Sequence, residues 1–218
     1  MTIQHHPQLS LYYAPVSCAL VPFILLTEAK ANFEIIKINN YAYQNLTPEY
    51  LQINPKGKVP ALAIDHDILT ENIAIQLWIA QHFPKANLLP KDPYLQIKAI
   101  SWLSWCSSAI HPHLTPINKP QRYCDLPGSE ENVRQLSTSL LFKDFEIAES
   151  HLKNKPWFFD DFTAVDAYFF WCFRRAVLFD LDLSLFPNCQ QHFEQMSERE
   201  SVKKIIDYEF SVIQEFKS

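Results

Sequence analysis

A cysteine near the start of the chain lies where a thiol can act as a nucleophile. Cys18 follows a short apolar and aromatic run, Leu9–Tyr13, and begins a predicted helix. The first turn of a helix has unpaired backbone amides and the positive end of the helix dipole, and both favour a thiolate over a thiol. Free cysteines are more often small buried residues, so the cysteine alone does not establish reactivity. Its position directly after a first strand favours the reactive interpretation.

A second segment, Asn54–Leu62, can bind a peptide backbone. Pro60 has no amide to donate, and it forces Val59 before it into an extended conformation. An extended Val59 offers one N–H and one C=O together, which is a short template for a ligand that is itself a peptide. An ordinary turn entering an edge strand explains the same residues.

A third segment, Thr70-Glu71-Asn72, stands at a predicted helix N-terminus. Exposed amides and the helix dipole bind anions there, including carboxylates. Glu71 can pair with a ligand ammonium, while Asn72 and backbone amides can receive a carboxylate. A plain helix cap with an acidic first turn is the simpler explanation.

The elements that must position these residues are strands and helices in a recognisable order. We expect a strand at 9–13, a helix at 17–29, a strand at 33–38, a short helix from 47, strands at 59–64 and 68–69, and a helix at 70–82. This order predicts a thioredoxin-like α/β domain, in which helices cover a mixed sheet.

The rest of the chain is predicted to be helical. Residues 83–93 contain three prolines and little periodicity, which indicates a linker. Helices are expected at 94–110, 130–152, 163–179, 189–196 and 198–210. We therefore predict a thioredoxin-like domain over residues 1–83 and an all-helical domain over residues 93–218.

Composition excludes several classes of function. The formal charge of −5 disfavours nucleic-acid binding, and no apolar stretch reaches the length of a membrane span. With two glycines in the chain, a glycine-rich phosphate loop is excluded. The five cysteines form no C-x-x-C pair, and the histidine pairs lack further ligands, so no metal site is expected. The polar start, Met1–Gln8, lacks the apolar region of a signal peptide, which favours the cytoplasm.

Taken together, the three segments resemble the cytosolic glutathione transferases, and most closely the bacterial β-class. That family has a start like YYSPGACSLAPH, then NPKGxVPAL, then LTEgxAI. This chain has Leu11–Pro22, Asn54–Leu62 and Leu69–Ile75 in the same order. Thr163–Tyr168 is similar to the family's capping element before a buried helix, where we expect Thr163 and Asp166 to have a structural role. The similarity extends from Leu9 to about Ile206.

The resemblance implies glutathione as a co-substrate bound by the first domain. Cys18 stands where β-class enzymes carry the cysteine that faces the glutathione sulfur and can form a mixed disulfide with it. Val59 would pair with the cysteinyl backbone, with Pro60 in the cis form. Glu71 and Asn72 would hold the γ-glutamyl end.

Four further residues are candidates by the same resemblance. Ser108 and His111 fall where the family brings polar groups to the site, although a surface or kink histidine beside Pro112 explains His111 equally well. In other classes a tyrosine ending the first strand, or a serine starting the first helix, hydrogen-bonds the glutathione thiolate. Tyr13 and Ser17 are the corresponding alternatives to Cys18.

The chain departs from the family pattern at the candidate site. Val16-Ser17 stands where the family has glycine before its cysteine, and Asn72 replaces the usual Ser or Gly. Residues 39–44 lack the family lysine that pairs with the glycyl carboxylate of glutathione.

We expect an enzyme that attacks a small hydrophobic electrophile, or exchanges with a disulfide, through the glutathione thiolate. A cysteine at the catalytic position favours disulfide reductase or dehalogenase chemistry. Aromatic residues such as Tyr12, with Trp105 or Phe173, would line the co-substrate side. The family also implies a homodimer. The alternative is a non-catalytic interaction protein that uses the same fold.

Overall fold

The computed structural model describes residues 7–217, which form two compact units. One unit contains the described residues up to Leu88 together with those from Glu200 onward, and the other contains Leu89–Arg199. Residues 1–6, on which the signal-peptide argument rests, lie outside the described residues. Within the described part, no helix combines the length and the apolar character needed to cross a membrane.

The first unit is built on a four-stranded sheet in the order β2-β1-β3-β4. The strands are β1 (Leu9–Tyr13), β2 (Glu34–Lys37), β3 (Ala61–Ile64) and β4 (Asp67–Thr70). β1 runs parallel to β2 and antiparallel to β3, and β3 runs antiparallel to β4. Alternate residues of β1 are buried, because successive side chains of a strand point to opposite faces.

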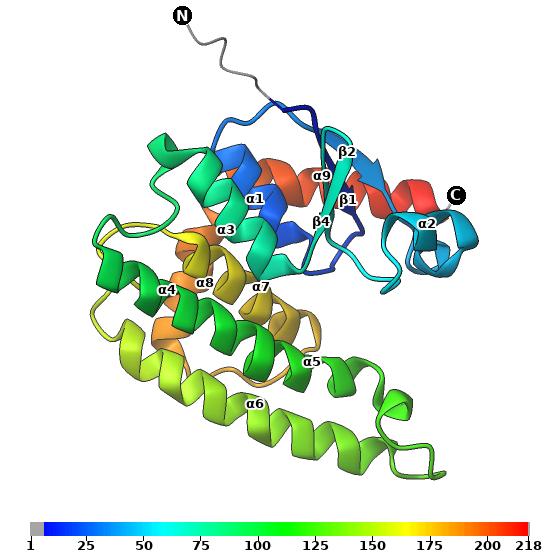
Figure 1. Cartoon of the computed structure of the whole chain (residues 1–218). Coiled ribbons are helices and arrows are strands. Elements are labelled where there is room, and N and C mark those ends of the chain that lie inside the picture. Colours follow the sequence, from blue (N-terminus) through cyan, green and yellow to red (C-terminus); the bar gives the residue numbers. More distant parts are fainter. Residues whose placement is uncertain (1–6, 218) are drawn as a thin grey trace, which may run out of the picture. The chain divides into compact units, whose positions relative to one another are not determined.

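Four α-helices and two short 3₁₀ turns complete this unit (Figure 1). They are α1 (Leu20–Glu28), η1 (Gln44–Leu46), α2 (Pro48–Ile53), α3 (Asn72–His82), η2 (Pro84–Ala86) and α9 (Glu200–Lys217). Every residue of α1 from Leu20 to Leu26 is buried, because α1 packs against both α3 and α9. The observed elements confirm the thioredoxin-like prediction.

The C-terminal helix α9 belongs to this first unit, whereas the sequence placed residues 198–210 in the helical domain. The physical reason is its buried stripe of Val202, Ile205, Glu209 and Val212, spaced three or four residues apart. Within the first unit, α9 packs on α1 and its Glu215 pairs with Lys37 of β2.

The second unit is helical, as predicted. It contains α4 (Pro93–Trp105), a π-helical turn η3 (Cys106–Ile110), α5 (His111–Asn118), a 3₁₀ turn η4 (Pro120–Arg122), α6 (Glu130–Leu152), α7 (Ala164–Leu178) and α8 (Pro187–Ser197). α7 is buried nearly all round and packs against α4, α5 and α8. Its start has the expected capping box, in which Thr163 and Asp166 satisfy each other's backbone amides.

Candidate active site

The turn before α1 has an unusual backbone. Val16 has φ = 64°, in the left-handed region that costs an L-residue roughly 1–2 kcal/mol and is rare for a β-branched side chain. The Ser17 hydroxyl donates to the Ala14 carbonyl at 2.7 Å and accepts the Ala19 amide at 3.2 Å. Helix α1 consequently begins at Leu20, three residues later than the sequence predicted.

Cys18 lies beside the predicted peptide-binding segment. Its thiol donates to the Val59 carbonyl, with 3.6 Å between Sγ and the oxygen, and the residue is 9% exposed. Burial raises the pKa of the Cys18 thiol to about 11, against the hydrogen bond from the Asn72 side chain and the charge of Lys58. This pKa predicts a neutral Cys18 thiol at neutral pH in the ligand-free protein, because the loss of solvation outweighs the hydrogen bonds and the Lys58 charge that favour a thiolate.

The raised pKa predicts how Cys18 reacts with an alkylating agent. A thiol with a pKa near 11 is protonated at neutral pH, so its rate of alkylation by iodoacetamide should rise about tenfold per pH unit from pH 7 to about 10. Mass spectrometry of the Cys18 peptide measures this rate, and the partly exposed Cys124 is an internal reference. A plateau already below pH 8 would contradict the buried neutral thiol.

Val59 presents backbone groups that the protein itself does not pair fully. The Val59–Pro60 peptide bond is cis, as the resemblance implied. Within residues 7–217 the Val59 amide has no hydrogen-bond acceptor. Gly57, at φ = 60°, shapes the preceding loop, since a Cβ there would lie 2.9 Å from the Leu46 side chain. The Lys58 carbonyl accepts from Tyr50 and holds the segment in place.

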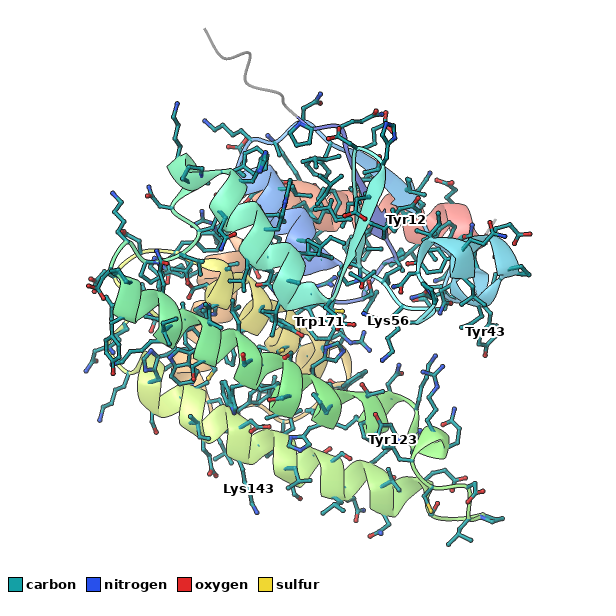
Figure 2. The ribbon with its side chains drawn as sticks, viewed as in Figure 1. Tyr12, Tyr43, Lys56, Tyr123, Lys143 and Trp171 are labelled. Atoms are coloured by element: carbon teal, nitrogen blue, oxygen red, sulfur yellow. The ribbon has the colours of Figure 1, made fainter. Side chains whose placement is uncertain are left out.

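The start of α3 combines an acidic side chain with a lysine that the sequence did not single out. Glu71 has φ = 75°, and its Oε1 lies 2.6 Å from the Nζ of Lys56. Lys56, labelled in Figure 2, extends from the loop between α2 and β3. It also donates to the Thr70 hydroxyl at 2.9 Å. In the free protein, Lys56 is therefore paired with the Glu71 carboxylate, the group expected to bind a ligand ammonium.

Asn72 connects α3 to Cys18. Its Nδ2 donates to the Cys18 carbonyl at 2.9 Å, and its Oδ1 accepts from the fully buried Gln76 at 3.0 Å. The structure therefore brings Cys18, Val59 and Asn72 together, and it gives the Asn72 side chain a partner other than a ligand carboxylate.

Tyr13 is fully buried, and its hydroxyl donates to Glu209 of α9 at 2.8 Å. Glu209 itself was missed by the sequence analysis. The available signal was a charged residue on the apolar stripe of α9, where an acid is costly unless it is hydrogen-bonded.

The two remaining candidates lie in the second unit. Ser108 is exposed in the π-helical turn η3. His111 is half-buried; its Nδ1 shares a hydrogen bond of 3.2 Å with the Tyr168 hydroxyl, and its ring packs on Trp171 of α7. Phe173, expected to line the co-substrate side, has no exposed surface and belongs to the core of this unit.

Metal chemistry has no candidate ligand set in the part of the chain that the structure describes. No group of three or more His, Cys, Asp or Glu residues there could hold a metal ion.

Comparison with known proteins gives the family. Residues 7–81 match the model of the glutathione S-transferase N-terminal domain. The chain is 30% identical to glutathione S-transferase GstA of Escherichia coli O157:H7, over 92% of this chain and 98% of the relative. The chain therefore belongs to the glutathione S-transferase family, as its motifs predicted.

Solved structures show the same relationship. A glutathione transferase homologue from Sulfitobacter, solved with bound glutathione, matches with a TM-score of 0.85 and 27% identity, over 92% of this chain and 98% of its own. The β-class glutathione S-transferase of Sphingomonas chungbukensis matches with a TM-score of 0.80 and 30% identity, over the same shares.

Proposed function

We propose that this protein is a glutathione transferase whose first unit binds glutathione along Val59 with the sulfur beside Cys18. The observation that carries the proposal is the juxtaposition of a buried thiol with a peptide-like edge. The Val59 amide is unpaired among residues 7–217, and the Val59 carbonyl has only the weak Cys18 thiol as a donor. The cysteinyl backbone of glutathione can use both groups, and this arrangement fits the family.

Charged groups around this edge match the two ends of the tripeptide. Glu71 can bind the γ-glutamyl ammonium when Lys56 moves away, since both side chains are largely exposed. The first-turn amides of α3 can receive the neighbouring carboxylate. Lys58 is exposed, adjoins Val59, and lies close enough for its charge to lower the pKa of Cys18. We assign it to the glycyl carboxylate, because Lys37 is paired with Glu215.

In this mechanism Cys18 acts on the glutathione sulfur as a donor. The ligand amide replaces the Cys18 thiol on the Val59 carbonyl, which frees the S–H to donate to the glutathione thiolate. The proton of the glutathione thiol leaves to solvent, the sulfur attacks the electrophilic carbon, and the leaving group departs with its bonding electrons. With a disulfide substrate the same thiolate attacks one sulfur, and the other sulfur leaves as a thiolate.

The proposal also includes residues of the second unit, the co-substrate and the oligomeric state. From the family resemblance we assign polar contributions to Ser108 and His111, and a hydrophobic electrophile or disulfide as co-substrate. We further propose a cytoplasmic homodimer with a role in detoxification. Light scattering that gave the mass of a single chain would contradict the dimer.

Titration calorimetry with glutathione tests binding. The wild-type protein should bind saturably in the millimolar range or below, and Glu71→Gln should weaken binding about ten- to a hundredfold, because a charged hydrogen bond contributes about 1.5–3 kcal/mol. Glu34→Gln, an exposed acid on β2, is the matched control and should leave affinity unchanged. No saturable binding by the wild type would favour the alternative, a non-catalytic interaction protein.

A further inference from the structure

The left-handed backbone of Val16 is not explained by the proposed glutathione site. Its φ of 64° suits glycine, and a valine with this backbone stays in place only where surrounding contacts hold it. The turn that it forms carries Ser17 and Cys18, so any relaxation of Val16 displaces the thiol from the Val59 carbonyl.

Glu209 supplies one such contact to Val16 from the other end of the chain. Its Oε2 accepts the Val16 amide at 2.6 Å and the Tyr13 hydroxyl at 2.8 Å, across 193 and 196 residues of sequence. Glu209 is 1% exposed on the buried stripe of α9. Hydrogen bonds to a carboxylate are short and about twice as strong as neutral ones, so one oxygen fixes the end of β1 and the turn relative to each other.

We propose that Glu209 is a positioning residue for Cys18: its carboxylate holds Val16 in the left-handed conformation and thereby fixes the turn that presents the thiol to Val59. In this proposal Glu209 acts on Cys18 through the turn at Val16. The catalytic consequence rests on the proposed function, but the positioning itself does not.

The specific consequence is a coupling between positions 16 and 209. Glycine adopts a positive φ without steric cost, so a protein with glycine at position 16 keeps the turn without the carboxylate. Loss of the Glu209 charge should therefore displace the Cys18 thiol when position 16 is valine, and should hardly affect it when position 16 is glycine. If Glu209 contributed only to packing, its replacement should have the same effect on Cys18 with valine or with glycine at position 16.

The test compares four proteins: wild type, Val16→Gly, Glu209→Gln and the double variant. The readout is the rate at which iodoacetamide labels Cys18, followed by mass spectrometry, which needs no glutathione. We expect Glu209→Gln to label at least tenfold faster than wild type, and Val16→Gly and the double variant to stay within threefold of wild type. Glu215→Gln, on the same helix and paired with exposed Lys37, is the matched control and should not change the rate.

Steady-state kinetics provides a second readout. Glu209→Gln should lower kcat about tenfold and change the KM for glutathione less than threefold, because the Val59 edge and Glu71 remain in place. The double variant should recover kcat to within threefold of Val16→Gly.

The outcomes separate this proposal from the proposed function. The positioning role is overturned if Cys18 is labelled at the wild-type rate in Glu209→Gln. It is also overturned if Glu209→Gln changes the labelling rate equally with valine and with glycine at position 16. Failure of glutathione to bind, with the labelling pattern as expected, contradicts only the function. Should Glu209→Gln fail to fold, a double variant that folds and labels slowly supports the proposal, and one that also fails to fold overturns it.

Discussion

Replacement of Asp166 by alanine should destabilise the protein by about 3–5 kcal/mol, the cost of breaking a buried charged network. Asp166 is fully buried at the start of α7. Its Oδ2 accepts the Thr163 amide at 2.8 Å and the Thr163 hydroxyl at 3.0 Å. Its Oδ1 accepts the Phe158 amide at 2.9 Å and lies 3.1 Å from Nε2 of the buried His192.

The size of this effect follows from what alanine leaves behind. Two buried backbone amides, of Phe158 and Thr163, would lose their acceptor, and each unsatisfied group costs about 1–3 kcal/mol. A cavity and the loss of the helix cap add to this cost. Since total stability is typically about 5–15 kcal/mol, the variant should be largely unfolded at moderate urea concentrations.

Urea denaturation followed by tryptophan fluorescence and circular dichroism measures the free energy of unfolding. Asp160→Ala removes an exposed acid six positions earlier and should change stability by no more than about 0.5 kcal/mol. Asp166→Asn should be intermediate, because an amide keeps one acceptor oxygen. A loss below about 1 kcal/mol in Asp166→Ala would show that water or neighbouring groups take over the hydrogen bonds.

Replacement of Cys18 by alanine should have the largest effect on activity. We expect kcat for the glutathione-dependent reaction to fall about a hundredfold, comparable with the removal of one donor to a developing anion. The dissociation constant for glutathione should change less than threefold, because Val59 and Glu71 are untouched. Measurement of turnover with a panel of electrophiles and mixed disulfides, together with calorimetry, gives both quantities.

Cys18→Ser separates the two roles open to this thiol. A serine hydroxyl donates a hydrogen bond but forms no disulfide, so the donor role predicts activity within about tenfold of wild type. A mechanism through a Cys18–glutathione mixed disulfide predicts that serine is as inactive as alanine. Cys124→Ala, a partly exposed cysteine of the helical unit, is the control and should keep full activity. Turnover by Cys18→Ala within twofold of the wild-type rate would contradict both the donor role and the mixed-disulfide role.

Much of the candidate site was predictable because its signals are local. Pro60 restricts Val59 directly, and Thr163 with Asp166 forms a capping box within a single turn. The apolar runs and turn residues of the first 82 residues gave the order of strands and helices for the same reason. Family motifs then assigned these local elements to a glutathione site.

The state of Cys18 was not predictable from its position at a helix start. The sequence shows the helix terminus that favours a thiolate, but not the burial that opposes it. Desolvation depends on every group packed around the sulfur, including Val59 from a distant loop. The Lys56–Glu71 ion pair was likewise invisible, because its two residues are neighbours only after β3 and β4 form.

The sequence by itself determined the secondary structure order, the family and the segments proposed to bind glutathione, since these depend on neighbouring residues and short spacings. Only the tertiary structure decided that α9 belongs with the first unit and that Glu209 supports the turn at Val16. An apolar stripe on a helix shows that it must be buried, but many partners can bury it. The partner is selected by packing and by hydrogen bonds between residues almost two hundred positions apart.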